Sequence, residues 1–188
     1  ASEVQKLESL RSAFYDQKFK NRRVSEDLTQ SIARSDGDLV IAQALSKLYK
    51  PTTGKSFAGM VNTSQYTDRK DMGKALILEA QKLIATSNKG TSKKVGSVAG
   101  YDIHIEKDPL SVGATFTLTD EFDAFFHPAN GMSILGSTVK RISQTDIKSG
   151  DLSPLGLVTS FESLAKNYQK SPALIKEGIA QAQKKLKN

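Results

Sequence analysis

The sequence predicts an α+β fold, in which a small antiparallel sheet packs with one helix and long N- and C-terminal helices form an antiparallel helical stalk. Two observations lead to this fold class. Apolar residues recur at helical spacing of three and four near both ends of the chain. Between these ends, apolar and polar residues alternate as in strands with one buried face. We therefore expect an N-terminal helical arm over residues 1–50, an α+β core over 51–154 and a C-terminal helical arm over 155–188.

Residues 2–34 predict a long helix, because a seam of residues follows 3–4 spacing and is apolar at its ends and polar in its middle. A two-stranded coiled coil tolerates such a mixed seam. Ser35, Asp36 and Gly37 predict a break, followed by a second helix that ends near Tyr49. The seam residues are Leu7, Leu10, Phe14, Gln17, Asn21, Val24, Leu28 and Ser31.

Residues 57–84 predict a strand, a turn and a helix. Phe57, Gly59 and Val61 share one strand face, residues 62–65 turn the chain, and Tyr66 begins the return. Thr67 or Asp68 is expected to cap the helix, and Gly73 to permit close packing against a strand. The buried helix face would consist of Met72, Ala75, Leu76, Ala80, Leu83 and Ile84.

The rest of the core predicts a flexible basic loop and further strands. The loop spans 87–94, and residues 100–106 and 113–119 alternate like antiparallel strands. Residues 120–128 and 132–143 are candidates for a third and a fourth strand.

The C-terminal arm is expected to contain two helices. One follows the Gly- and Pro-containing residues 149–156 and runs to about Gln169. Ser171 and Pro172 resemble a cap and a first-turn proline, so a second helix is expected to begin there.

Composition excludes several classes of function. The chain has no cysteine, which removes disulfides, thiolate nucleophiles and cysteine-based zinc sites. No apolar run approaches the roughly 18 residues that a membrane span needs, and we expect no membrane partner. The first residue is Ala1, so either an initiator Met was removed or a longer chain was processed or trimmed.

Catalytic and metal chemistry are weakly indicated. His104 and Glu106 point the same way on a strand and could join His127, Asp123 or Glu121 in a metal site, but polar residues on a solvated sheet face are the commoner explanation. Acids at 120–123 have no nucleophile or pocket nearby. The Gly54–Ser56 triplet lacks the preceding glycine and strand of a phosphate-binding loop. We therefore expect no catalytic residue, metal or cofactor.

The net charge of +7 suggests an anionic partner, most simply nucleic acid bound without sequence specificity. Arg69 and Lys70 are expected to project outward, and the loop at 87–94 offers the best phosphate contact; the alternative is a solvated basic surface. The candidate nucleic-acid-binding residues are Arg69, Lys70, Lys89, Lys93, Lys94, Lys140, Arg141, Lys184 and Lys185. Phe125 is the candidate exposed partner contact within an otherwise inward-facing aromatic stretch.

One pattern in the core resembles a known family. "F-x-x-x-V-x-x-x-x-Y-T-D-R-K-D-x-G-x-A-L", from Phe57 to Leu76, resembles a module near the C-terminus of very large phage and conjugative-element proteins, which join an SNF2-like helicase to an N6-adenine DNA methyltransferase and of which some are linked with antirestriction. The family's "G-x-x-x-G-[YF]" segment is matched by Gly96, Gly100 and Tyr101. The likeness covers about residues 5–188 in order, and only 57–76 is specific.

One departure matters. The family's later turn runs "G-N-[IL]-x-R-[IL]-[ED]-N", whereas Gly156 is followed here by Leu157, Val158, Thr159, Ser160 and Phe161, so the Asn and the Arg are missing. Helicase and methyltransferase motifs are also absent from this chain.

The resemblance implies a non-catalytic accessory protein of a phage or mobile element, in the bacterial cytoplasm or a virion interior. It would associate with DNA in antirestriction or DNA delivery. Two alternatives stay open: an internal head protein packaged and injected with DNA, and an adaptor or inhibitor of a host defence enzyme that acts through its helices. A protein partner or a homodimer through the helices is also compatible with the stalk.

Overall fold

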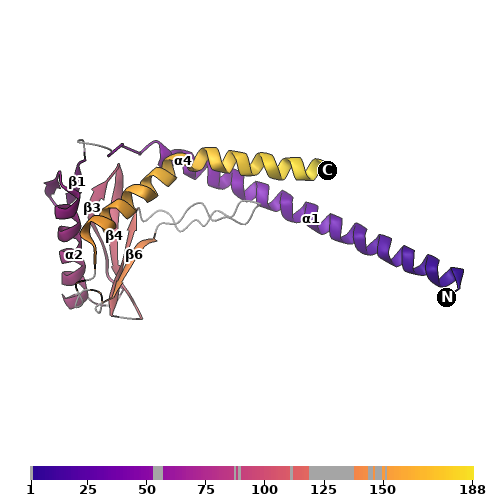
Figure 1. Ribbon diagram of the computed structural model, residues 1–188, viewed down its shortest axis with the longest axis horizontal. Coiled ribbons are helices and arrows are strands. Elements are labelled where there is room, and N and C mark those ends of the chain that lie inside the picture. The colour runs from indigo at the N-terminus through magenta and orange to yellow at the C-terminus, as the bar shows by residue number, and fades with distance from the viewer. Residues whose placement is uncertain are drawn as a thin grey trace.

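The computed structural model describes residues 2–52, 57–86, 88, 90–110, 112–118, 138–143, 146, 150 and 152–188. Its helices and strands are α1 (Glu3–Ser46), β1 (Gly59–Val61), β2 (Ser64–Tyr66), α2 (Arg69–Thr86), β3 (Ser92–Val98), β4 (Tyr101–Lys107), β5 (Gly113–Leu118), β6 (Thr138–Ser143) and α4 (Pro154–Lys187). The α+β class is confirmed, with the sheet flanked by two long terminal helices (Figure 1). The expected strand at 120–128 lies outside the described residues.

The described strands form one antiparallel sheet in the order β2-β1-β3-β4-β5-β6. The strand–turn–helix unit is confirmed, but its turn is shorter than expected and consists of Asn62 and Thr63. Asn62 adopts a positive φ of 53°, as a tight two-residue hairpin turn requires. Asp68 caps α2 by accepting a hydrogen bond from the Asp71 amide at 2.9 Å.

The basic loop expected at 87–94 is in part wrong, because β3 begins at Ser92. The strand is inserted between β1 and β4, and Val95 and Val98 are buried in the core. Gly96 allows β1 to lie close, since a Cβ there would stand 2.1 Å from the Met60 carbonyl oxygen. A glycine and serine content that suggests a loop is here compatible with a central strand.

The core lies on one face of the sheet. Alternate residues Tyr101, Ile103 and Ile105 of β4 are fully or almost fully buried, whereas Asp102 and Glu106 on the other face of the strand are exposed. Helix α2 packs against this sheet and against α4, with Met72, Leu76 and Leu83 buried as expected. Phe116 of β5 meets Phe161 of α4 edge to face, with ring centroids 5.9 Å apart.

Gly73 permits close packing, but its neighbour is the first turn of α4 and not a strand. A Cβ on Gly73 would lie 2.0 Å from the carbonyl oxygen of Pro154. The two helices therefore approach backbone to backbone at this point, which corrects the expected partner of this glycine.

Helix α1 is continuous from Glu3 to Ser46, so the break expected at residues 35–37 is wrong. A glycine inside a helix costs only about 1 kcal/mol relative to alanine. Burial of the apolar residues Ala42 and Leu45, which follow Gly37 in the helix, exceeds that cost.

Helix α4 is also continuous, and the second helix expected to begin at Pro172 does not exist as a separate element. Pro172 has no N–H for the carbonyl of Tyr168, four residues earlier. The hydroxyl of Ser171 donates to that same carbonyl oxygen at 2.8 Å. The Ser-Pro pair thus supplies a substitute hydrogen bond within the helix instead of a new cap.

The second half of α4 runs antiparallel to α1, which confirms the predicted stalk, and α1 extends well past the C-terminus of α4 (Figure 1). Two buried tyrosines attach the stalk to the sheet. Tyr101 of β4 donates to the Leu45 carbonyl at 2.6 Å, and Tyr168 of α4 donates to the Leu118 carbonyl at 3.2 Å. Their rings are 5.2 Å apart, and burial raises the pKa of Tyr101 to about 12.

Candidate nucleic-acid interface

The positive charge of the chain is concentrated on α4. This helix carries six lysines and two glutamates, a net charge of +4 out of the +7 of the whole chain. Helix α1 is longer but carries seven basic and seven acidic residues, which cancel. The six lysines are Lys166, Lys170, Lys176, Lys184, Lys185 and Lys187.

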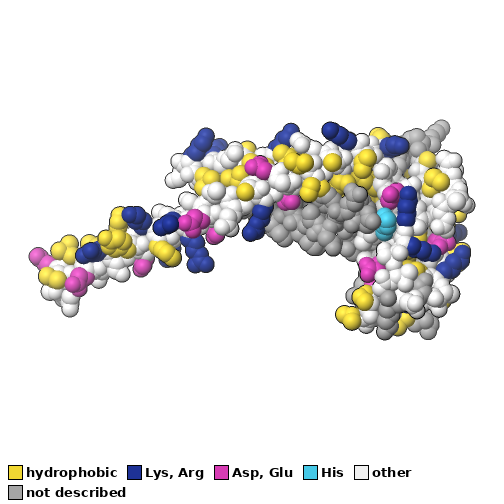
Figure 2. Space-filling view, turned by 180° about the vertical axis from the view of Figure 1, so that it is seen from behind, with side chains coloured by type: hydrophobic (Ala, Val, Ile, Leu, Met, Phe, Trp, Pro, Cys, Tyr) yellow, Lys and Arg dark blue, Asp and Glu magenta, His cyan; other side chains and the backbone are white. Residues whose placement is uncertain are grey.

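All six lysines of α4 are exposed, because the opposite side of the helix faces the core. That buried side includes Phe161, Ala165, Tyr168, Ile175 and Ala182. Figure 2 shows lysine and arginine side chains spaced along the upper edge of the molecule, over α4. Among the described residues, none of the six forms an ion pair with a carboxylate. The lysine side of α4 is therefore a band of positive charge open to solvent.

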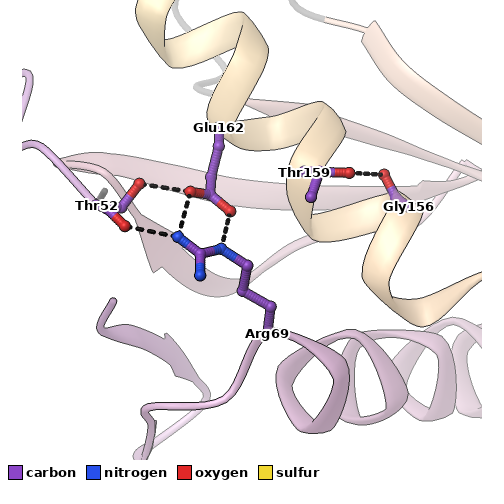
Figure 3. A network of polar contacts seen from close by, with 5 residues as sticks. All are labelled: Thr52, Arg69, Gly156, Thr159 and Glu162. Atoms are coloured by element: carbon purple, nitrogen blue, oxygen red, sulfur yellow. Dashed lines mark hydrogen bonds and ion pairs between the residues drawn. The ribbon is translucent and has the colours of Figure 1, made fainter. Parts of the chain in front are cut away.

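Arg69 does not project outward, so this expectation is wrong. Its guanidinium forms two hydrogen bonds with the carboxylate of Glu162 on α4, Nε to Oε1 at 2.7 Å and Nη2 to Oε2 at 3.1 Å. Nη2 also donates to the carbonyl oxygen of Thr52 at 2.7 Å, and the Thr52 hydroxyl donates to Glu162 at 2.6 Å (Figure 3).

The same guanidinium lies over the Phe57 ring, 4.6 Å from its centroid. The hydrogen bond to Glu162 raises the pKa of Arg69 above its ordinary value. A bidentate pair of this kind joins the start of α2, the segment after α1 and the start of α4. Arg69 thus holds three parts of the fold together and is not an exposed phosphate contact.

Lys93 and Lys94 of β3 each have an acidic partner. Lys93 Nζ lies 3.2 Å from Glu79 Oε2, and Asn62 Nδ2 donates to the other Glu79 oxygen at 3.0 Å. Burial acts to raise the pKa of Glu79, but the hydrogen bonds from Lys93 and Asn62 outweigh it and lower the pKa. Lys94 Nζ lies 3.0 Å from Asp102 Oδ1.

Among the described side chains, Lys70 and the lysines near the end of α4 do not form one patch. Lys70 is exposed in the first turn of α2, beside the sheet, whereas Lys184 and Lys185 lie near the end of α4, which extends away from the sheet along α1 (Figure 1). The backbones of Lys140 and Arg141 lie in β6, opposite Phe116 and Thr115 of β5. Lys89 and Phe125 lie outside the described residues.

The described part of the chain provides no third ligand for a metal site at His104 and Glu106. Both residues lie in β4, paired with Thr117 and Thr115 of β5. The described residues contain no group of three or more histidine, aspartate and glutamate side chains placed to hold a metal ion. The other ligands considered, at 121, 123 and 127, lie outside them.

Besides Lys187, which follows Lys184 and Lys185 in the last turn of α4, the structure adds Lys166, Lys170 and Lys176 to the candidate interface. A sequence signal for them exists, because Lys166 and Lys170 are four residues apart and all three fall between the apolar positions of the α4 stripe. The interface candidates that the sequence and the structure share are Lys184 and Lys185.

No helix among the described residues has the length and apolarity needed to cross a membrane. Comparison of the chain with family models, with curated proteins and with solved structures finds no match in any of the three.

Proposed function

We propose that this chain is a non-catalytic accessory module that binds the sugar–phosphate backbone of DNA through the lysines of α4. The observation that carries the proposal is the net charge of +4 on α4, together with the exposure of its six lysines. Lysine acts as a point charge toward phosphate, and backbone contacts carry no direct sequence information. Binding would therefore be independent of sequence and sensitive to salt.

The dimensions of the lysine band suit a nucleic-acid backbone. From Lys166 to Lys187 the band spans 21 residues of helix, or about 32 Å at a rise of about 1.5 Å per residue. Duplex DNA carries one negative charge per roughly 1.7 Å of its axis. The band can therefore meet several phosphates at once without inserting into a groove.

The proposed setting is the one that the resemblance implies, a phage or conjugative element acting in the bacterial cytoplasm or from a virion interior. A contact supports it: the acidic position of the family's turn, counted from Gly156, falls on Glu162, which pairs with Arg69 of the other motif. Two separated parts of the pattern thus meet in space. Antirestriction and DNA delivery are the proposed roles.

The test is a fluorescence-anisotropy titration of a labelled duplex and a labelled single strand at two salt concentrations. We expect binding that weakens with salt. The triple variant Lys170→Gln, Lys176→Gln, Lys184→Gln should lower the affinity. It should also reduce the slope of log K against log salt by about 0.9 for each phosphate that a lysine no longer neutralises.

The matched control is Lys47→Gln, Lys50→Gln, Lys74→Gln, which lowers the net charge by the same amount at exposed lysines outside α4. It should affect binding much less. Absence of binding at low salt would overturn the proposal. Equal decreases in affinity in the two triple variants would overturn the assignment of binding to α4.

A further inference from the structure

One heptad seam runs along nearly all of α1. Its a positions are Leu7, Phe14, Asn21, Leu28, Ser35 and Ala42, and its d positions are Leu10, Gln17, Val24, Ser31, Asp38 and Leu45. From Leu28 onward, every a and d residue is buried or half-buried. This part of the seam packs against α4.

The other part of the seam has no cover among the described residues. We call residues 3–27 the free arm, because every one of them is exposed. Leu7, Leu10 and Phe14 expose 66%, 68% and 65% of their surface. Figure 2 shows apolar side chains along this protruding segment. A helix of this length gains stability in water mainly by burying such a face.

A helix that covers the exposed seam of the free arm must lie end to end with α4 along α1. Helix α4 lies on the α1 seam and stops near Leu28, so the free arm is the same interface extended beyond the end of its partner. A helix that enters at that point and runs in the direction of α4 would complete a two-stranded coiled coil.

We propose that the occupant is the free arm of a second copy of this chain, packed antiparallel. In an antiparallel coiled coil, a positions of one helix meet d positions of the other. The register that covers the whole free arm places Leu7 beside Val24, Leu10 beside Asn21 and Phe14 beside Gln17 of the second copy. Each polar seam residue then faces an apolar one, which explains why the polar residues occupy the middle of the seam.

The length of the free arm selects this register. A shift of one heptad in one direction would leave the residues next to Leu28 uncovered. A shift in the other direction would drive the second helix into the space that α4 occupies on the seam. In the chosen register the N-terminus of each α1 abuts the C-terminus of the other chain's α4.

A parallel dimer does not fit the same seam. Helix α1 is continuous to Ser46, so a parallel second α1 would run on into the part of the seam that α4 covers. It would also place Lys6 of one chain at g next to Arg11 of the other at e, a repulsive pair.

Charge supports the antiparallel pairing at its ends. Lys6 comes to lie beside Asp27 of the second copy, and the lysine-rich last turn of α4 meets Glu3 in the first turn of the second α1. Arg11 and Lys18 form a like-charge pair near the centre, which moderates the affinity. Lys6 and Asp27 are about six helical turns apart within one chain, so they can interact only between chains.

Disulfide trapping tests the register, since the chain has no cysteine of its own. The full chain is made as Leu10→Cys and, separately, as Asn21→Cys. An oxidised mixture of the two should give a covalent dimer, whereas each variant alone should not. The matched control mixes Ser12→Cys with Phe19→Cys, at the same level but on the opposite side of the helix, and should give none.

A charge exchange tests the pairing without cysteine. In sedimentation equilibrium the unmodified chain should reach twice its mass of 20.4 kDa as concentration rises. Lys6→Glu and Asp27→Lys should each weaken dimerisation by about three- to tenfold, and the double variant should restore it. Circular dichroism of each variant checks that the helices remain.

A monomer at every concentration overturns the proposal. Crosslinking of Leu10→Cys alone overturns the antiparallel arrangement, because it joins equal positions. Weakening by both single substitutions without restoration in the double variant overturns the proposed register. This dimer does not depend on the proposed DNA binding, so a failure to bind DNA does not affect it.

Discussion

The two halves of α1 carry one heptad pattern and lie in opposite environments. In the half that ends at Ser46 the seam is packed on α4, and Leu45 is only 4% exposed. In the free arm the equivalent d position, Leu10, is 68% exposed. The sequence pattern is the same, and the difference lies in the length of the partner helix. Amphipathic spacing identifies a face that can be buried, but the extent of the partner decides how much of that face is buried.

The largest expected difference between the halves comes from truncating these two leucines. Leu45→Ala removes buried methyl groups next to the Tyr101 hydrogen bond and should lower the free energy of unfolding by about 2–5 kcal/mol. Leu10→Ala should change it by less than about 0.5 kcal/mol at a protein concentration low enough to keep the chain monomeric. Urea unfolding followed by circular dichroism gives both values.

Equal destabilisation by Leu45→Ala and Leu10→Ala at such a concentration would show that the free arm is packed within one chain, contrary to its exposure.

Two Gly→Ala substitutions should change the free energy of unfolding in opposite directions. Gly73→Ala would place a Cβ against the Pro154 carbonyl, where α2 and α4 meet. Because the contact is with backbone, relief would require one helix to move away from the other. The substitution should therefore destabilise the fold by about 1–3 kcal/mol. Gly37→Ala in α1 meets no atom within 4 Å and should stabilise by about 0.5–1 kcal/mol. Thermal unfolding of the two variants beside the unmodified chain measures both.

A stabilising Gly73→Ala would mean that α2 and α4 do not approach each other backbone to backbone. A destabilising Gly37→Ala would mean that α1 is not a regular helix at that position.

The smallest effect concerns acid pH. The folded-state pKa of Glu79 is lowered below its ordinary value of 4.5, so its contribution to stability is present above that value and is lost as pH falls through the folded-state pKa. Glu79→Gln should reduce stability at neutral pH and flatten its decrease in acid. Glu26→Gln in the free arm is the control, because its exposed pair with Arg22 contributes little. Urea unfolding at several pH values gives both curves.

An unchanged acid dependence in Glu79→Gln would contradict the role assigned to the Lys93 and Asn62 hydrogen bonds.

Local patterns were sufficient to predict the strands and the buried faces. Alternation from Tyr101 to Ile105 and helical spacing from Met72 to Leu83 correspond to the observed burial. The same local rules predict helix breaks at Gly37 and Pro172, where none exists. At both positions a modest local cost is offset by packing or hydrogen bonds that a propensity rule does not include: packing on α4 around Gly37, and the Ser171 hydroxyl beside Pro172.

The candidate site was harder to predict because its charges depend on distant partners. The neighbouring charged residues predict an exposed Arg69, but its partner Glu162 lies 93 residues later in the chain. Lys93 and Glu79 meet only because β3 is inserted beside β1. The lysines of α4 avoid the apolar stripe of the helix, which is a signal in the sequence, but the sequence predicts two shorter helices that meet at Pro172 instead of one continuous helix.

Because α1 is one continuous helix, the directions of the side chains at its N-terminal end are set by those at its packed C-terminal end. Successive residues of an α-helix turn by about 100° and rise by about 1.5 Å, so the direction in which Leu7 points is set by the direction in which Leu45 points. Deletion of one residue between them would turn the tip by more than a quarter of a circle, whereas addition of seven would nearly preserve its direction and move it outward by about 10 Å. Natural length variation in this segment is therefore expected in steps of whole heptads.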